Sequence, residues 1–235
     1  MSGTERPARN ELMDALRGLA VCLMVLHHFL YDLCEFLGAP WWLFTNPVFD
    51  VLHYFFAGLF IFLSGISSDF SRSNLKRGAK AMALALGITL VTYFMDMTIV
   101  FGVLHLLGVC MMLYPVYKKL PTQALATVGV VLVVTGYLIS GTVVEAKFLF
   151  PFGFVYEGFT SSDFFPILPH LGWYMLGTVL GRTVYADKKT RLPGTFRESV
   201  IARFFCWCGR QSLFIYLLHQ PIVYGLLELI ASLKR

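Results

Sequence analysis

The sequence predicts an all-α, polytopic membrane protein, built as a single bundle of about seven transmembrane helices. Hydrophobic residues make up 57% of the 235 residues and aromatic residues 16%, whereas only 14% are charged. This composition lies far from that of a soluble globular domain. Because a transmembrane helix needs about 20 mostly apolar residues, seven spans leave little chain for anything else. We therefore expect one transmembrane domain over residues 1–235.

The expected spans are apolar runs bounded by charges or helix breakers. They cover residues 12–37, 47–67, 78–98, 100–117, 122–142, 163–183 and 209–231. The first run follows Arg6 and Arg9 but is too long for a cleaved signal peptide, so we expect it to be a retained span. Residues 195–208 are expected to form an amphipathic helix in the membrane interface, anchored by Arg197 and Arg203.

Basic residues between the spans predict the orientation of the chain. If all seven spans form, most of them fall on one side: Arg6, Arg9, Arg72, Lys76, Arg77, Lys80, Lys118, Lys119, Arg182, Lys188, Lys189, Arg191, Arg197 and Arg203. The other side carries Lys147, Lys234 and Arg235. The positive-inside rule then puts the N-terminus in the cytoplasm and the C-terminus outside. The basic loops serve topology and attraction to anionic lipids, or they bind a phosphate-rich ligand.

The first span carries a polar stripe. At about 100° per residue, its acids and bases apart from His27 share one face: Asp14, Arg17, His28, Asp32 and Glu35. A charged side chain at the centre of a transmembrane helix costs about 2.5–3.5 kcal/mol, so we expect this face to point into the bundle or a water-filled cavity. Asp32 follows His28 by one turn and can orient its ring.

Other polar residues are distributed along the remaining spans. Arg17 and His28 lie eleven residues apart, or about 16 Å along a helix axis, so they contact different parts of one long ligand or are unrelated. Arg210 falls on the cytoplasmic side. His53, His105 and His170 fall on the outer side, with His219 near the middle. A lone histidine in a membrane helix can instead join two helices by a hydrogen bond, which remains an alternative for His27, His53 and His105.

Two residue types are interpreted as structural. The cysteines lie in or beside apolar segments and are expected to be reduced and buried; they are Cys22, Cys34, Cys110, Cys206 and Cys208. No metal site is predicted from them. Gly177 and Gly181 in LGTVLGR are expected to be small-residue packing points between helices.

Several segments carry a family resemblance. They are ELMDALRGLAVCLMVLHHFLYDL, FAGLFIFLSGISS, FGVLHLLG, PHLGWYMLGTVLGR and CGRQSLFIYLLHQPI. In this order, over nearly the whole chain, they resemble bacterial relatives of the heparan-α-glucosaminide N-acetyltransferase catalytic domain. The first span also resembles the wider transmembrane acyltransferase superfamily, including acyltransferase family 3.

The resemblance implies acyl transfer across a membrane. The donor would be cytoplasmic acetyl-CoA or another acyl-CoA, and the acceptor a hydroxyl or amine of a carbohydrate-type molecule on the outer side. In acyltransferase family 3 an arginine and a histidine eleven residues later form the reactive pair, which corresponds to Arg17 and His28 here. The heparan-type enzymes instead carry a reactive histidine between the first two spans. This chain has none there, and His53 is the nearest substitute.

The resemblance also suggests roles for individual residues. His28 would be the general base, oriented by Asp32, or a nucleophile that forms an acyl-histidine. Arg17 and Arg210 would hold the phosphates of CoA, with Asp14 beside them. The substrate-side candidates are His53, His105, Asp163, His170 and His219; Asp163 is alternatively the N-cap of the sixth span.

The expected location is the bacterial cytoplasmic membrane. The expected partners are the lipid bilayer, acyl-CoA and the acceptor, with no nucleic acid, and a homo-oligomer is left open. Two other classes of protein compete with this interpretation. A proton-coupled transporter or channel would also use intramembrane histidines and acids, but the spans show no paired Gly/Pro-broken helices in two halves. A membrane cytochrome would use paired histidines as haem ligands and would show a Soret band.

Overall fold

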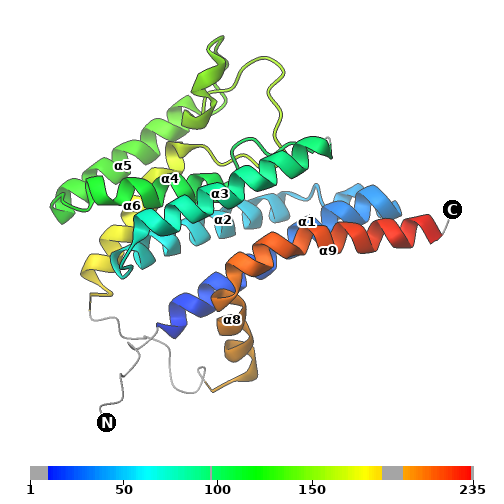
Figure 1. The fold of residues 1–235 in the computed structure, drawn as a ribbon, viewed down its shortest axis with the longest axis horizontal. Helices are drawn as coiled ribbons and strands as arrows, with labels where there is room; N and C mark the ends of the chain where they lie inside the picture. The colour runs from blue at the N-terminus through cyan, green and yellow to red at the C-terminus, as the bar shows by residue number, and fades with distance from the viewer. Residues whose placement is uncertain (1–9, 96, 187–197, 234–235) are drawn as a thin grey trace. The chain divides into compact units, whose positions relative to one another are not determined.

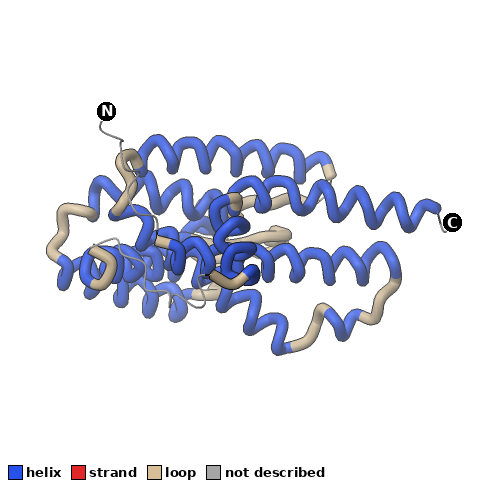
Figure 2. The backbone as a smooth tube through the Cα atoms, turned by 90° about the horizontal axis from the view of Figure 1, so that it is seen from below, coloured by secondary structure: helices blue, strands red, loops and turns tan. Residues whose placement is uncertain are grey.

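The computed structural model describes residues 10–95, 97–186 and 198–233, and the regular elements in these ranges are helices (Figures 1 and 2). The α-helices are α1 (Glu11–Leu37), α2 (Pro47–Asp69), α3 (Asn74–Phe94), α4 (Val103–Tyr117), α5 (Thr122–Ile139), α6 (Ile167–Thr183), α8 (Val200–Arg210) and α9 (Ser212–Leu233). Two 3-10 helices, η1 (Trp41–Leu43) and η2 (Lys147–Phe152), lie in loops. The predicted all-α class is confirmed.

Four of the described helices are long and apolar enough to cross a membrane, namely α1, α2, α5 and α9. On α9 the exposed surface is largely apolar, as a lipid-facing helix requires; it includes Leu213, Phe214, Leu218, Ile222, Leu226, Leu229 and Leu233. The chain is therefore an integral membrane protein. The count of seven spans is not confirmed, because α4 has only 15 residues, or about 22 Å of helix, and α3 and α6 do not meet the same criterion.

Several helix boundaries differ from the sequence prediction, among them the starts of α3, α6 and α8. Helix α3 begins at Asn74, four residues before the predicted start, because the helix includes the basic turn that precedes the apolar run. Helix α6 begins at Ile167 and is non-helical at Leu168, since a residue before proline is disfavoured in the α region. Helix α8 begins at Val200, within the segment that was predicted to form an amphipathic helix, and its position in the membrane interface stays a prediction. Arg197 lies outside the described residues.

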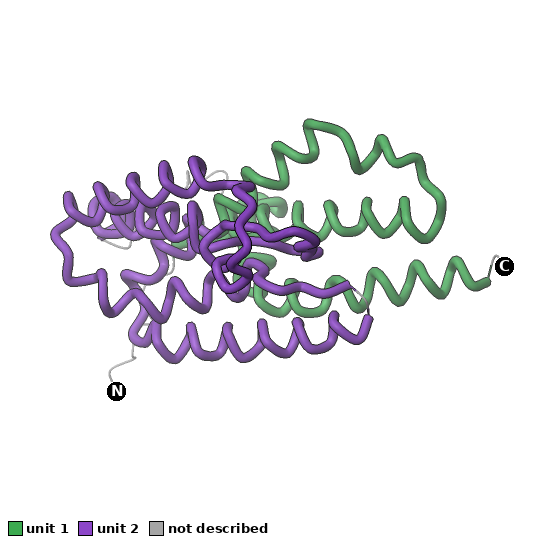
Figure 3. Tube along the Cα trace, turned by 90° about the horizontal axis from the view of Figure 1, so that it is seen from above, with its two compact units in different colours: residues 1–60, 187–235 green, residues 61–186 purple. Residues whose placement is uncertain are grey.

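The chain divides into two compact units (Figure 3). Unit 1 comprises residues 1–60 and 187–235, and unit 2 comprises residues 61–186, so that α2 contributes to both. The expectation of a single transmembrane domain stays a prediction.

In unit 1, α1 packs against both α8 and α9 (Figure 1). Helix α1 is well delimited: the Asn10 side chain accepts a hydrogen bond from the backbone N–H of Met13, and Gly38 closes the helix with φ 67°. A left-handed residue at this position suits glycine because it has no Cβ. Helix α8 begins in the same manner as α1, with the Ser199 hydroxyl accepting from the N–H of Ala202 at 3.1 Å.

Two glycines allow α1 and α8 to approach backbone to backbone. A Cβ atom added to Gly18 would overlap the carbonyl of Phe205, and one added to Gly209 would overlap the carbonyl of Asp14. Because apolar contact between helices gains little in lipid, close packing at small residues is a main source of helix association in membranes. The crossing therefore depends on glycine at both positions.

In unit 2, the helix pairs α3–α4 and α5–α6 use the same kind of contact. Gly78 and Gly108 face each other's helices in the first pair, and Gly129 and Gly172 do so in the second. A Cβ at Gly177 would overlap the carbonyl of Phe62 on α2, and Gly181 lies close to the next turn of that helix. The prediction that Gly177 and Gly181 are packing points is confirmed.

A polar cluster at one end of unit 2 joins three helices. Asp69, at the end of α2, accepts hydrogen bonds from the Tyr114 hydroxyl at 2.7 Å and from Nε of Arg182 at 3.3 Å. The same guanidinium donates to the carbonyls of Leu120 and Lys118. Arg182 thus satisfies carbonyl groups that follow the last turn of α4, which have no partner inside that helix.

We predict that Gly18→Ala or Gly209→Ala lowers the free energy of unfolding by about 1–3 kcal/mol, the usual cost of overpacking. Gly225→Ala on α9 is the matched control, because a Cβ there meets nothing within 4 Å. In the control, the better helix propensity of alanine should leave stability unchanged or raise it by up to about 1 kcal/mol. Thermal unfolding of the three purified variants in detergent checks this. Equal effects at the three positions would contradict the close crossing.

Candidate active site

Four histidines of unit 1 form a row of neighbouring rings. The ring of His53, on the first part of α2, stacks on that of His27, with centroids 4.0 Å apart and an interplanar angle of 25°. The rings of His27 and His28 lie 5.8 Å apart, and those of His28 and His219 lie 5.0 Å apart. The two adjacent histidines of α1 therefore point to different partners, as their separation of about 100° around the helix predicts.

Hydrogen bonds define which nitrogen of His28 and His219 carries the proton. Nδ1 of His219 lies 2.8 Å from the carbonyl oxygen of Tyr216, which can only accept. Neutral His219 is therefore protonated on Nδ1, and its Nε2 is an acceptor. That Nε2 lies 3.3 Å from Nδ1 of His28, which also lies 3.0 Å from the carbonyl oxygen of Met24. His28 is thus protonated on Nδ1 and shares this proton between two acceptors.

The remaining nitrogen of His28 is available for chemistry. Within the described part of the chain, the hydrogen bonds of His28 all use Nδ1, so that neutral Nε2 keeps its lone pair. An imidazole nitrogen in this state can take a proton from an attacking group, or can itself attack a carbonyl carbon. His28 therefore has the chemistry of a general base or a nucleophile.

Asp32 is fully buried, with 0% of its surface exposed. The side-chain amide of Gln220 lies 3.2 Å and 3.0 Å from the two carboxylate oxygens. The expected contact between Asp32 and His28 is not among the described hydrogen bonds. Side chains of a helix lean toward its N-terminus, so the ring of His28 reaches back to Met24, while Asp32 lies one turn in the other direction. Gln220 takes the place of His28 as the partner of the carboxylate.

Gln220 is the residue that the sequence prediction missed. It stands in LLHQPIV, where two polar residues precede a proline inside an apolar span. Polar side chains in membrane helices are costly and usually face the protein interior, so this pair was a usable signal. The amide oxygen of Gln220 is buried and has no partner among the described residues.

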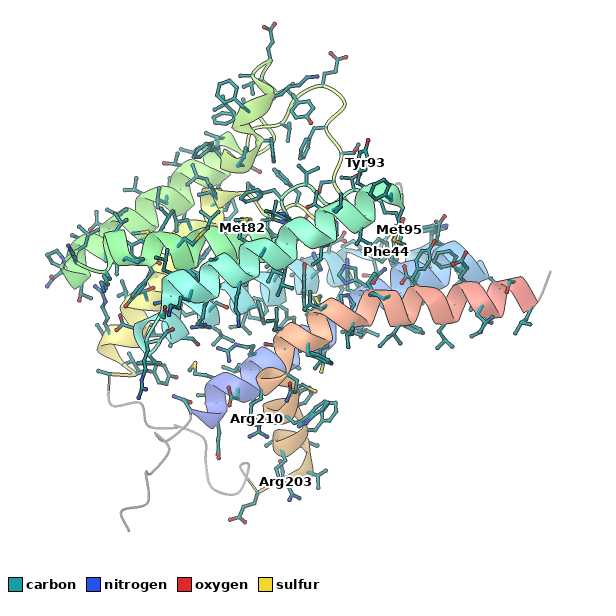
Figure 4. All side chains as sticks on the ribbon, in the orientation of Figure 1. Phe44, Met82, Tyr93, Met95, Arg203 and Arg210 are labelled. Carbon is teal, nitrogen blue, oxygen red and sulfur yellow. The ribbon has the colours of Figure 1, made fainter. Side chains whose placement is uncertain are left out.

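The predicted donor-binding residues lie together at the start of α1. Nη1 of Arg17 is 3.4 Å from Oδ1 of Asp14, and the two side chains are 16% and 6% exposed. Gly209 packs on the backbone of Asp14, which brings the C-terminal end of α8, with the exposed Arg210, to the same place. Figure 4 shows Arg210 at this end of α8 and Arg203 nearer the other end.

Cys206 lies in the same region and is not positioned as a nucleophile. Burial raises the pKa of its thiol, and the carboxylates of Asp14 and Glu11 raise it further. The five cysteines are free thiols. In the described ranges there is no group of three or more His, Cys, Asp or Glu residues that could hold a metal ion.

The structure places the other candidates in unit 2, where they hold local structure. Nδ1 of His105 accepts from the N–H of Gly102, so its Nε2 carries the proton that faces the hydroxyl of Thr89 at 3.2 Å. Both ring nitrogens of His105 are therefore engaged at the start of α4. His105 is a helix cap in this arrangement, without a lone pair for catalysis.

Asp163 and His170 also contact backbone. Asp163 accepts from the N–H of Val103 at 3.2 Å, so it caps α4; the alternative that it caps the sixth helix is wrong, because α6 begins after Pro166. Nδ1 of His170 lies 2.7 Å from the carbonyl oxygen of Pro166. Because a carbonyl oxygen can only accept, this contact assigns the proton of neutral His170 to Nδ1, as in His28 and His219.

These features define an integral membrane protein with a histidine and carboxylate cluster between two of its membrane helices. The model of the family described as heparan-alpha-glucosaminide N-acetyltransferase, catalytic, matches residues 9–221. The match covers most of the chain, and the chain belongs to this family. The matched range includes the whole cluster from His28 to Gln220. The family implies a membrane acetyltransferase. No curated protein and no solved structure matched the chain.

We predict that Gln220→Ala lowers the free energy of unfolding by about 1.5–3 kcal/mol, the usual worth of hydrogen bonds to a charged group. The same substitution should cost less in an Asp32→Asn background, because the lost bonds are then between neutral groups. Unfolding of the four variants of this cycle in detergent measures the difference. An equal cost in both backgrounds would show that Gln220 acts independently of Asp32.

Proposed function

We propose that the chain transfers an acetyl group from acetyl-CoA, or a related acyl-CoA, to a hydroxyl or amine of a carbohydrate-type acceptor. The observation that carries this proposal is the free lone pair on Nε2 of His28, held in place by the Met24 carbonyl and His219. Membership of an acetyltransferase family supports the reaction class. The tautomer supports His28 as the reacting histidine.

In the proposed reaction, Nε2 of His28 takes the proton of the acceptor as its oxygen or nitrogen attacks the thioester carbonyl. The bond from the acceptor to the carbonyl carbon forms, and the carbon–sulfur bond breaks. General-base catalysis of this kind typically contributes 10²–10⁴-fold in rate. In the alternative route, the same lone pair attacks the thioester first and gives an acyl-histidine. Both routes need Nε2 unprotonated.

The donor is proposed to bind along α1. Arg17 and Arg210 would contact the CoA phosphates, because guanidinium pairs well with phosphate, and Asp14 would position Arg17 through their ion pair at 3.4 Å. Arg17 and His28 are separated by about 16 Å along the helix, so one extended ligand could place its phosphates at one and its thioester at the other. Under the predicted orientation this runs from the cytoplasmic end of α1 outward.

The acceptor side is proposed to lie near His53 and His27. Their stacked rings, with Phe44 4.9 Å from His27, form an aromatic surface beside His28. His105 and Asp163 are less suited to the acceptor because their side chains hold the start of α4. His170 contacts the Pro166 carbonyl and the ring of Phe165, and among the described ring contacts it has no second histidine beside it. We therefore assign the acceptor site to unit 1 alone.

We predict that His28→Ala abolishes acyl transfer, with a loss of about 10²-fold or more. Binding of CoA, followed as thermal stabilisation of the purified protein, should stay near that of the parent. His27→Ala is the comparison variant, since it removes a neighbouring imidazole that faces His53 instead of His219. Because His27 belongs to the proposed acceptor surface, its loss should raise KM for the acceptor and leave kcat largely unchanged. Transfer of radiolabelled acetyl from acetyl-CoA measures both. Full activity in His28→Ala would overturn the assignment.

The orientation gives a separate prediction. Arg72→Cys, between α2 and α3, should be protected from an impermeant thiol reagent in intact cells, whereas Thr142→Cys, after α5, should be labelled. Both positions are exposed, and four of the five native cysteines are buried, so background labelling should be low. Disruption of the cells should make Arg72→Cys reactive. Labelling of Arg72→Cys in intact cells would place the basic loops outside and reverse the proposed direction of transfer.

A further inference from the structure

We propose that His219 is a second proton carrier in the reaction, which takes the Nδ1 proton of His28 when Nε2 of His28 is protonated. This inference rests on the proposed function, in which His28 is the base. It gives His219 a catalytic role, because a proton that moves during the reaction passes through its ring.

The rings of His28 and His219 are oriented so that a protonated nitrogen of one faces a lone-pair nitrogen of the other, as a proton transfer requires. Nδ1–H of His28 faces Nε2 of His219 at 3.3 Å, and Nε2 of His219 is a lone-pair nitrogen because the Tyr216 carbonyl holds the proton on Nδ1. The other acceptor of His28, the Met24 carbonyl, is far too weak a base to take a proton. Within the described residues, His219 is the base that Nδ1 of His28 can reach.

The remaining ionisable groups around the pair are engaged elsewhere or more distant. On α1, Asp32 is bound by Gln220, and His27 lies T-shaped to His28 while it stacks on His53. Tyr31 contacts Phe44 and Trp41, and Glu35 is exposed. On α9, Tyr216 faces His219 at 6.0 Å between ring centroids. On α2, Asp50 interacts electrostatically with His53. On α8, the thiol of Cys206 contacts the backbone carbonyl of Glu11.

The proton path balances over one turnover. As the acceptor attacks, its proton moves to Nε2 of His28, and the Nδ1 proton of His28 moves to Nε2 of His219, which becomes an imidazolium. The positive charge is thereby moved one ring away from the acceptor. When the carbon–sulfur bond has broken, the proton returns from His219 to Nδ1 of His28, and the Nε2 proton of His28 passes to the CoA thiolate. The products are the acylated acceptor and CoA thiol.

His219→Gln separates proton transfer from simple orientation of His28. A glutamine side chain offers an amide oxygen where Nε2 of histidine stood, so it can still accept from Nδ1 of His28, but it cannot be protonated. We expect KM to stay near the parent value and kcat to fall about 10²-fold. The pH profile of kcat should also lose one ionisation. His219→Asn and His219→Ala provide variants that do not place an acceptor at this point.

If His219 only orients His28, His219→Gln should instead recover the parent kcat and keep the parent pH profile, which would overturn the proposal. A measurement without turnover separates this from a failure of the proposed function. In ¹⁵N-histidine spectra of the parent protein, His28 and His219 should take up one shared proton before a second, and His28 should titrate alone in His219→Gln. Independent titration of the two rings in the parent would overturn the proposal even if acyl transfer is observed. A shared proton without any acyl transfer would instead reject the function and leave the pair intact.

Discussion

The contact between α1 and α9 depends on four polar side chains in a membrane that cannot hydrogen-bond them. Asp32 is fully buried, and His28, His219 and Gln220 are half-buried. Lipid cannot hydrogen-bond a carboxylate, an amide or an imidazole, so each of these groups must find its partner inside the protein. Asp32 meets Gln220, and His28 meets His219. If either helix were replaced by an apolar one, the polar groups on the other helix would lose their hydrogen-bond partners. The cohesion of this helix pair and its proposed chemistry therefore come from the same four side chains.

This dual role explains why the site lies where it does. Close packing at Gly18 and Gly209 anchors α8 against the start of α1, and α9 follows α8 directly along the chain. The position of α8 thus places α9 against the second half of α1. The polar stripe of α1 then lies beside His219 and Gln220 of α9 near one end. Near its other end it lies beside the end of α8, where Arg210 stands.

Much of this arrangement was predictable from the sequence. Composition and span length predicted the all-α membrane fold, the helical period separated His28 from His27, and the small residues of α6 were identified as packing points. The partners of the polar groups were harder to predict, because they depend on which helices pack together. The helical periodicity of α1 indicates that Asp32 faces the protein interior. Only the position of α9 identifies Gln220 as its hydrogen-bond partner. For the same reason the engagement of His105 and Asp163 at the start of α4 was not predictable.

His219 and Gln220 are consecutive on α9, yet they contact residues four apart on α1. A one-residue slide of α9 along α1 would move its side chains by about 1.5 Å and about 100°. Such a slide would put Leu218 or Pro221 at a position that needs a hydrogen-bonding group. The two adjacent contacts therefore depend on both the axial position and the rotation of α9 relative to α1. A pair of helices in the wrong register would lose both contacts. In a bilayer, where apolar surfaces slide past one another at little cost, such a polar doublet defines the alignment of the two helices.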